Sequence, residues 1–507
     1  MGWGHGGTRP EIGRRELLLG SLGVLATGAL TSSCSGDDPA SVRLIDPRGT
    51  QVRSAERVRR SPGQRIVSAR LTAQESSVDL GSRTVRTWTY GDALPGPLLR
   101  TTAGDRLRVA VTNDLPAETS VHWHGVALSN DMDGVPGMTQ EPIRAGGAFT
   151  YEFTTPDPGT YFFHPHTGVQ LDRGLYGVLV VDDPAEPGDY DQEWIVVLDD
   201  WVDGTGRTPD EVLAGLLSMT GGGDSGMGHG GMGHAGTGEG MTSPLLGGAG
   251  DVDHPYFLVN GRTPETPVTL TGRPGQRARL RIVNAGSDTA FRVALGGHRL
   301  TVTHSDGFPV EPVTTDALLI GMGERYDVTV ALGDGVFPLV ASAEGKGGRA
   351  LALVRTSGGA APRSGVEVPE LDRRVLLGGD LTASDGSRLA RRAVDRRLDV
   401  VLSGAMVPYR WTINGETFHH GDPLVVASGE RVRLRLTNHS MMFHPVHLHG
   451  HTFGLVEGGA RKDTVIVRPM ESLEVDVDAA NPGQWALHCH NIYHAEAGMM
   501  TTLAYRA

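Results

Sequence analysis

The chain has 507 residues, enough for two to four domains that each bury a core of their own. Its 72 glycines and 30 prolines, with frequent valine and threonine, favour many short strands joined by tight turns, so we expect an all-β protein. The formal net charge of −13 argues against binding to nucleic acid or to an anionic membrane surface. Small molecules or cations are the partners that this charge favours.

Residues 1–34 are predicted to be an export signal. Arg14 and Arg15 precede an apolar stretch, 17–30, that is too short to span a bilayer, and GRRELLL resembles a twin-arginine signal. Such a signal predicts a periplasmic or extracellular protein. Cys34 is either a lipid-modified first residue, which would anchor the protein to a membrane, or it is lost in a simple cleavage. In neither case do we expect a disulfide with Cys489.

The pattern G-x-R-x-R-x4-N divides the rest of the chain, because it occurs three times. The copies run from Gly104 to Asn113, from Gly275 to Asn284 and from Gly429 to Asn438. Each copy alternates apolar residues with polar ones, which indicates a strand with one buried face, its arginines on a solvated face and its asparagine in a turn. Three consecutive β-domains are therefore predicted, over residues 45–184, 185–365 and 366–507.

Histidines spaced H-x-H follow the first and third copies. Nine residues after Asn113 and Asn438 the sequences HWHG and HLHG begin, whereas the second copy has only Val293 there. HPH and HCH then follow a Pro-Gly pair at equal spacing. The eight histidines are His122, His124, His164, His166, His447, His449, His488 and His490. Since alternate side chains of a strand share a face, both histidines of a pair project together, and four pairs at matching positions indicate metal sites rather than ordinary buried histidines.

The segment HCHNIYHAEAGMM places Cys489 between two histidines of one strand. Alternation turns the thiol away from His488 and His490, so it can bind a different metal on the opposite face. The candidate ligands there are His444, Cys489, His494 and Met499. Two imidazoles, a thiolate and a weak axial thioether are typical of a blue-copper electron-transfer site. Electrons that arrive at this site can leave through the Cys489 backbone to both neighbouring histidines.

HWHG, HPH, HPVHLHG and HCH-x3-H-x4-M resemble the four signature motifs of multicopper oxidases, of the three-domain laccase and bacterial copper-efflux-oxidase type. The resemblance covers nearly the whole chain after the signal and implies three consecutive cupredoxin-like Greek-key β-sandwich domains holding four copper ions. It implies a type 1 copper on His444, Cys489, His494 and Met499, a type 2 copper on His122 and His447, and type 3 coppers on His124, His164 and His490 and on His166, His449 and His488. Domains one and three then share the trinuclear cluster, and domain two acts as a spacer.

The implied reaction is the one-electron oxidation of four donor equivalents, coupled to the reduction of one O2 to two waters. Proton delivery to the cluster requires a carboxylate. Asp133, eleven residues after His122, matches the acidic residue that such oxidases place near the type 2 copper. Glu496 is the candidate for a second proton carrier, although bacterial copper-efflux oxidases usually have the acid one position earlier, at Ala495.

The donor is expected to be cuprous ion, or a phenol or aminophenol. Met441 and Met442 resemble the methionine pair at the substrate-copper site of efflux oxidases, although Ser440 replaces the usual acid. Residues 219–241 form a glycine-dominated segment of low complexity, which is either a flexible insertion or a copper-recruiting loop. The soft and borderline copper ligands at its centre are Met227, His229, Met232 and His234.

A copper-free structural protein of the cell envelope with the same three-domain fold is the alternative from another functional class. Such a protein would lack most of the ligands, whereas this chain has ten ligand histidines, the cysteine and the methionine. We therefore expect a copper oxidase that acts on O2 and small donors, as a monomer and without a nucleic-acid partner.

Overall fold

The computed structural model describes residues 42–186, 188–219 and 242–507, and residues 43–507 form one compact unit. The predicted export signal with Cys34 lies outside the described residues. The same is true of the centre of the methionine-rich segment, with Met227, His229, Met232 and His234. Within the described ranges, no helix is both long and apolar enough to cross a membrane.

Six sheets form three consecutive β-sandwiches, as the threefold repeat predicts, and each sandwich encloses its own apolar core. In each sandwich the first strand pairs in parallel with the strand that carries the repeat. The first sandwich contains β1 (Ile66–Asp79), β2 (Thr84–Tyr90), β3 (Leu99–Thr102), β4 (Arg106–Asn113), β5 (His122–His124), β6 (Ala148–Thr154), β7 (Gly159–His164) and β8 (Gly177–Asp182).

The second and third sandwiches repeat this arrangement with additional strands. The second contains β9 (Gln192–Trp201), β10 (Tyr256–Val259), β11 (Val268–Thr271), β12 (Arg277–Asn284), β13 (Phe291–Leu295), β14 (Leu300–Ser305), β15 (Phe308–Thr315), β16 (Ala317–Ile320), β17 (Arg325–Ala331), β18 (Val336–Ala343), β19 (Arg349–Arg355) and β20 (Val375–Leu376). The third contains β21 (Arg396–Met406), β22 (Tyr409–Ile413), β23 (Leu424–Val426), β24 (Arg431–Asn438), β25 (His444–Leu448), β26 (Phe453–Leu455), β27 (Arg461–Lys462), β28 (Thr464–Val467), β29 (Ser472–Asp478), β30 (Gln484–Cys489) and β31 (Met500–Tyr505). β20 lies beyond residue 365, the predicted end of the second domain, yet it pairs with β16 of the second sandwich. The predicted domain boundaries stay predictions.

The repeat strands β4, β12 and β24 each begin at the first arginine of the pattern and end at its asparagine. The asparagines Asn113, Asn284 and Asn438 are fully buried, and each side-chain amide donates to backbone carbonyls beyond the strand. Each asparagine thereby holds the loop that leads towards the next strand. In the first and third sandwiches, that loop leads to the histidines.

The repeat arginines depart in part from the prediction of a solvated face. β4 alternates between buried and exposed residues, but β12 is buried along all but its first residue. Arg279 and Arg431 are each only 3% exposed. They pair with Asp327 of β17 and Asp478 of β29, on the neighbouring antiparallel strands. The prediction is wrong for these two residues because a paired carboxylate allows a guanidinium to be buried.

Helices occupy few of the residues that the structure describes. The α-helices are α1 (Thr50–Arg59), α2 (Pro209–Leu217) and α3 (Ile492–Glu496), and the 3₁₀ helices are η2 (Asn130–Met132), η3 (Gln170–Arg173), η4 (Pro369–Asp372), η5 (Gly378–Asp380) and η6 (Val456–Gly458). The side chain of Asn491 caps α3 by accepting from the backbone N–H groups of Tyr493 and His494. This cap fixes the turn that carries His494 directly after the end of β30.

Candidate metal centres

Two antiparallel strand pairs present the predicted histidines. In the first sandwich His122 of β5 lies opposite His164 of β7, and in the third His447 of β25 lies opposite His488 of β30. In the second sandwich, Val293 of β13 is fully buried in the apolar core. The histidine-bearing strands thus match between the first and third sandwiches, and an apolar side chain replaces the histidine in the second.

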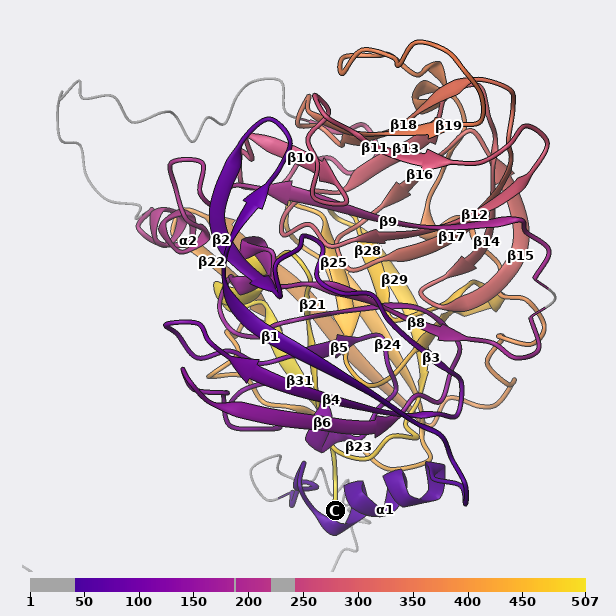
Figure 1. Ribbon diagram of the computed structural model, residues 1–507. Helices are drawn as coiled ribbons and strands as arrows, with labels where there is room; N and C mark the ends of the chain where they lie inside the picture. Colours follow the sequence, from indigo (N-terminus) through magenta and orange to yellow (C-terminus); the bar gives the residue numbers. More distant parts are fainter. Residues whose placement is uncertain (1–41, 187, 220–241) are drawn as a thin grey trace, which may run out of the picture. The chain divides into compact units, whose positions relative to one another are not determined.

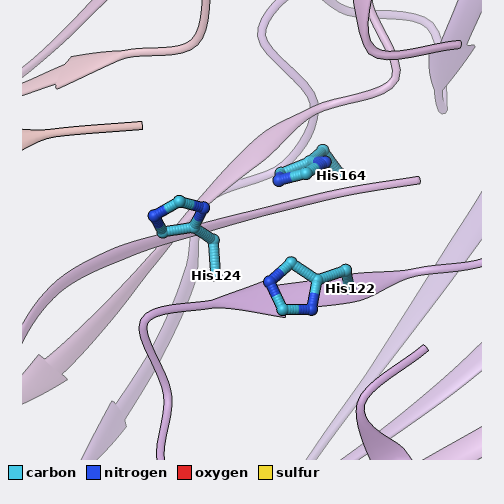
Figure 2. A group of neighbouring side chains, drawn as sticks. All are labelled: His122, His124 and His164. Carbon is cyan, nitrogen blue, oxygen red and sulfur yellow. The ribbon is translucent and has the colours of Figure 1, made fainter. Parts of the chain in front are cut away.

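All eight H-x-H histidines converge, four from each of two sandwiches, in what we call the histidine cluster. The rings of His122 and His449 stack with centroids 3.7 Å apart, and those of His124 and His447 stack at the same distance. Both contacts join the first sandwich to the third. Figure 2 shows three members from the first sandwich, His122, His124 and His164, arranged around a common space.

The hydrogen bonds of the histidine cluster leave ring nitrogens free to bind metal. The Nδ1–H of His122 donates to the carbonyl of Asp133 at 2.9 Å, and that of His447 to the carbonyl of Asp463 at 3.0 Å. Among the described residues, the buried cluster nitrogens without a hydrogen-bond partner are Nε2 of His122, His164, His166 and His447, Nδ1 of His124, and both ring nitrogens of His490. A metal-binding histidine typically donates one ring N–H to an oxygen and keeps its other ring nitrogen free for the metal. The cluster therefore fits the implied coppers.

The protonation state of the cluster also suits metal binding. Burial lowers the pKa of His124, His164, His166, His447, His449, His488 and His490. For His488 the pKa falls to about 3. Buried imidazoles are therefore neutral at physiological pH and offer their lone pairs to a cation.

A second group lies on the other face of β30, as the alternation of side chains predicts. The Sγ of Cys489 is 3.5 Å from Nδ1 of His444 and 3.6 Å from Nδ1 of His494, and the two Nδ1 atoms are 3.1 Å apart. All three side chains are fully buried. Met499 is also fully buried, and its backbone is bonded to both Cys489 and His494. We call this group of four residues the cysteine site.

The outer ring nitrogens at the cysteine site have fixed partners. The Nε2–H of His494 donates to Asp251 at 2.7 Å, and that of His444 donates to the hydroxyl of Ser440 at 2.8 Å. Both Nδ1 atoms therefore face Cys489. Burial opposes protonation of His494, but the carboxylate of Asp251 and the sulfur of Cys489 raise its pKa to about 10. The site thus attracts a cation, and a metal ion would displace the proton.

Asp133 lies directly behind the histidine cluster. It is fully buried in the loop after η2, its Oδ2 accepts from Nδ1–H of His449 at 3.0 Å, and its Oδ1 lies 3.3 Å from Nδ1 of His122. Among the described residues that Oδ1 has no hydrogen-bond partner. Asp133 therefore contacts one histidine of the first sandwich and one of the third.

Glu496 and the methionine pair lie nearer the surface. Glu496 is exposed at the end of α3, and it lines a small cavity together with His164, His166, His488 and His490. Met441 is 74% exposed, whereas Met442 packs against the core of the third sandwich. The structure therefore puts Glu496 on an opening towards the cluster.

Two carboxylates that contact the candidate ligands were not predicted from the sequence. Asp251, which bonds to His494, follows the methionine-rich segment, and Asp463, which bonds to His124 and His447, precedes β28. Neither stands in a motif or at a repeat position. The only sequence signal is general, namely that a metal-binding histidine requires an oxygen partner for its outer nitrogen.

Comparison with known proteins identifies the family. Sequence models described as multicopper oxidase match residues 72–186, 193–359 and 394–507. The chain belongs to the multicopper oxidase family. The multicopper oxidase MmcO of Mycobacterium tuberculosis is 48% identical over 501 residues, which cover 97% of each chain. A copper resistance protein A homolog of Pseudomonas syringae is 29% identical over 85% of this chain and 90% of its own.

A solved laccase agrees with this relationship. The laccase from Botrytis aclada superposes with a TM-score of 0.71 at 26% identity and covers 87% of this chain and 88% of its own. The predicted cupredoxin-like fold is confirmed, and so is the predicted class of oxidoreductases that use O2. Membership of the family also implies that the protein binds copper. The assignment of each histidine to a particular copper stays a prediction.

Proposed function

We propose that the protein couples the one-electron oxidation of four donor equivalents to the four-electron reduction of O2 to water, with one type 1, one type 2 and two type 3 coppers. The observation that carries this proposal is the geometry of β30. Cys489 faces the histidines of the cysteine site, while its neighbours His488 and His490 belong to the histidine cluster. One short stretch of backbone therefore joins both candidate centres.

Bound copper would supply the redox chemistry at both centres. The protein would hold the ligands in place, provide the path for electrons and deliver protons. Electrons would pass from the Cys489 thiolate through its backbone to the two flanking imidazoles. The Nδ1–H of His488 donates to the carbonyl of Cys489 at 2.9 Å, which gives the path a second connection besides the covalent one. Cys489, His488 and His490 are buried, which limits contact between the electron path and bulk water.

Proton supply to the cluster is assigned to Asp133 and, from the outer side, to Glu496. Asp133 supports this role because one buried oxygen lacks a partner while the other holds His449. Glu496 supports it because it lines a cavity that also reaches the cluster histidines. A carboxylate at the surface and another beside the cluster would form the two ends of a proton path.

We propose cuprous ion as the main donor and phenols or aminophenols as secondary donors, in a role in copper tolerance. Met442 lies two residues before His444, and Met441 offers an exposed thioether beside it. The described flanks of segment 219–241 join apolar clusters that include residues of the third sandwich, since Met219 packs against the cluster that holds its core and Leu246 belongs to one cluster with Phe443. Methionine thioethers suit cuprous ion, which supports a copper-gathering role for this segment and for the Met441–Met442 pair.

The proposed setting is the periplasm or the extracellular side of a membrane, reached by the twin-arginine-like signal, with Cys34 either lipid-modified as an anchor or removed by cleavage, and with the protein as a monomer. The test of function is aerobic steady-state kinetics of the copper-loaded protein, with oxygen uptake measured against cuprous ion and against a methoxyphenol. We expect four donor equivalents oxidised per O2 and a larger kcat/KM for cuprous ion. Release of hydrogen peroxide instead of water would contradict the four-electron reaction, and a preference for the phenol would contradict the donor.

A further inference from the structure

The segment GMGERYD, residues 321–327 of the second sandwich, contains no metal ligand yet packs against the histidine cluster. Its first four residues connect β16 to β17, which lie in the two sheets of that sandwich, and its last three begin β17 (Figure 1). Gly323 has a φ of +83°, and a Cβ added there would lie 2.9 Å from His124 and 3.0 Å from His490. The backbone of the second sandwich therefore touches a ring from each of the other two sandwiches.

Arg325, two residues further on, connects all three sandwiches. It is fully buried, and its Nη1 and Nη2 donate to Oδ1 and Oδ2 of Asp463 at 2.7 and 2.6 Å. Its Nε donates to the carbonyl of Thr160 on β7 at 3.0 Å. A two-pronged bond from a planar guanidinium fixes both the position and the plane of a carboxylate.

The carboxylate that Arg325 fixes is itself bonded to the histidine cluster. Oδ1 of Asp463 accepts from Nε2–H of His124 at 3.1 Å and lies 3.5 Å from Nδ1 of His447, whose N–H donates to the Asp463 carbonyl. One aspartate thus orients a histidine from the first sandwich and another from the third. The other nitrogens of these rings, Nδ1 of His124 and Nε2 of His447, have no hydrogen-bond partner among the described residues.

A separate contact already docks the second sandwich on the third. Lys462 is fully buried, and its Nζ donates to the hydroxyl of Ser305 at 2.7 Å and lies 3.1 Å from carboxylate oxygens of both Asp306 and Glu324. Docking of the two sandwiches therefore does not depend on Arg325 alone. A change at Arg325 can alter the orientation of Asp463 while the sandwiches remain together.

We propose that Arg325 is a positioning residue of the trinuclear site. It sets the orientation of the Asp463 carboxylate, and through it the orientation of His124 and His447, and so it determines how tightly the histidine cluster holds copper. On this proposal the second sandwich is not only a spacer, because it supplies the group that aligns ligands of the other two. The proposal rests on the copper sites of the proposed function.

The test is Arg325→Lys, which keeps the charge but cannot form two parallel hydrogen bonds. Arg281→Lys is the matched control, because Arg281 is a buried arginine of the same sandwich that also bonds to Thr160 but pairs with Glu193 and Asp327 instead of Asp463. Copper content is followed during titration with a chelator, together with the EPR spectrum of type 2 copper and the visible absorbance of the copper thiolate.

For Arg325→Lys we expect the chelator concentration that removes the trinuclear copper to fall about ten-fold, as for the loss of other groups that orient metal ligands. The type 2 EPR spectrum should change and the thiolate absorbance should stay the same. Arg281→Lys should match the unchanged protein in all three readouts. Equal copper retention in the two variants would overturn the proposal. If instead the unchanged protein itself bound no trinuclear copper, the proposed function would fail, and this inference would fall with it.

A double-mutant cycle with Asp463→Asn tests the route of the effect. If Arg325 acts through Asp463, Arg325→Lys should add no further copper loss in the Asp463→Asn background, whereas losses that multiply would overturn that route. If Arg325→Lys does not fold, Asp463→Asn alone takes its place. Copper retention by that variant equal to that of the unchanged protein would then contradict the proposal.

Discussion

The cysteine site and the histidine cluster differ in how much of the molecule is needed to build them. The cysteine site takes all its candidate ligands from the third sandwich, on β25, at the end of β30 and around α3. The histidine cluster takes four histidines from each of the first and third sandwiches, and the second sandwich packs Gly323 against it. The candidate ligands of the cysteine site therefore come together within one sandwich, whereas those of the histidine cluster come together only where the first and third sandwiches dock.

The two centres also differ in their electrostatic surroundings. At the cysteine site, Asp251 from the second sandwich raises the pKa of His494 to about 10 against the effect of burial. In the cluster, burial and neighbouring imidazoles lower the pKa of His488 to about 3. A carboxylate beside one ring and imidazoles beside the other explain the contrast, so the two centres should respond differently to acid and to mutation.

The largest expected effect is that of Cys489→Ser. Because the thiolate joins the two centres, this variant should lose both the visible absorbance of a copper thiolate and all donor oxidation. The trinuclear copper should remain, since its candidate ligands are unchanged. Absorbance spectra and copper analysis check both points. A blue, active variant would contradict the assignment of the type 1 ligand.

Gly323→Ala should affect the opposite centre. The new methyl group would press on His124 and His490, so we expect loss of trinuclear copper and of O2 reduction, with the thiolate absorbance retained. Gly275→Ala is the matched control, because Gly275 has a φ of +82° with no atom within 4 Å, so it carries the same backbone cost of about 1–2 kcal/mol without the contact. Equal copper loss in both variants would show that backbone strain, not contact with the histidines, is responsible.

Asp133→Asn should slow reoxidation of the reduced coppers by O2 about 100-fold, the lower end of the rate loss expected when a general acid is removed. Reduction of the cysteine site by the donor should stay nearly unchanged. Asparagine keeps an oxygen that can accept from Nδ1–H of His449, so the ring should keep its position. Stopped-flow measurement separates the two half-reactions. Normal reoxidation across the pH range would remove Asp133 from the proton path.

Acid should destabilise the copper-free protein through histidines buried near the cluster. Burial lowers the pKa of His451 from 6.5 to about 4. Between these values the unfolded chain binds a proton there that the folded chain does not, so the free energy of unfolding falls as the pH falls, by about 3 kcal/mol for this residue. Urea unfolding at pH 7 and pH 4.5 measures the change.

The control for this pH dependence is His451→Gln, which removes the titrating group. Glutamine can donate to the carbonyl of His449 and accept from the Tyr505 hydroxyl, as the imidazole does. The difference in stability between the two pH values should be smaller in this variant. An unchanged difference would show that other groups cause the acid sensitivity.

The smallest expected effect concerns the donor side alone. Replacement of residues 219–241 by a short Gly-Ser linker should raise the apparent KM for cuprous ion a few-fold, because thioethers that gather this ion are removed. Phenol oxidation and the histidine cluster should be unaffected. If cuprous oxidation were unchanged in a fully copper-loaded variant, the segment would be an inert insertion, and the case for a copper-oxidising role would rest on Met441 and Met442.

The sequence by itself determined the strands and the candidate metal ligands. The repeat predicted a strand at β4, β12 and β24, and strand alternation predicted that Cys489 and its flanking histidines face different groups. These are local properties, because the spacing of side chains along one strand is fixed by backbone geometry. The absence of histidine at Val293 likewise predicted that the second sandwich supplies no such ligand.

Only the tertiary structure decided which residues hold those ligands in place. Arg325 and Asp463 are 138 residues apart, Asp251 and His494 are 243 apart, and neither contact follows from a period or a motif. Arg279 is buried although its pattern predicted a solvated face, and this too depends on a partner that lies far away in the sequence. Charge pairing and ring orientation arise where sandwiches or sheets meet, and strand periodicity carries no information about which surfaces meet.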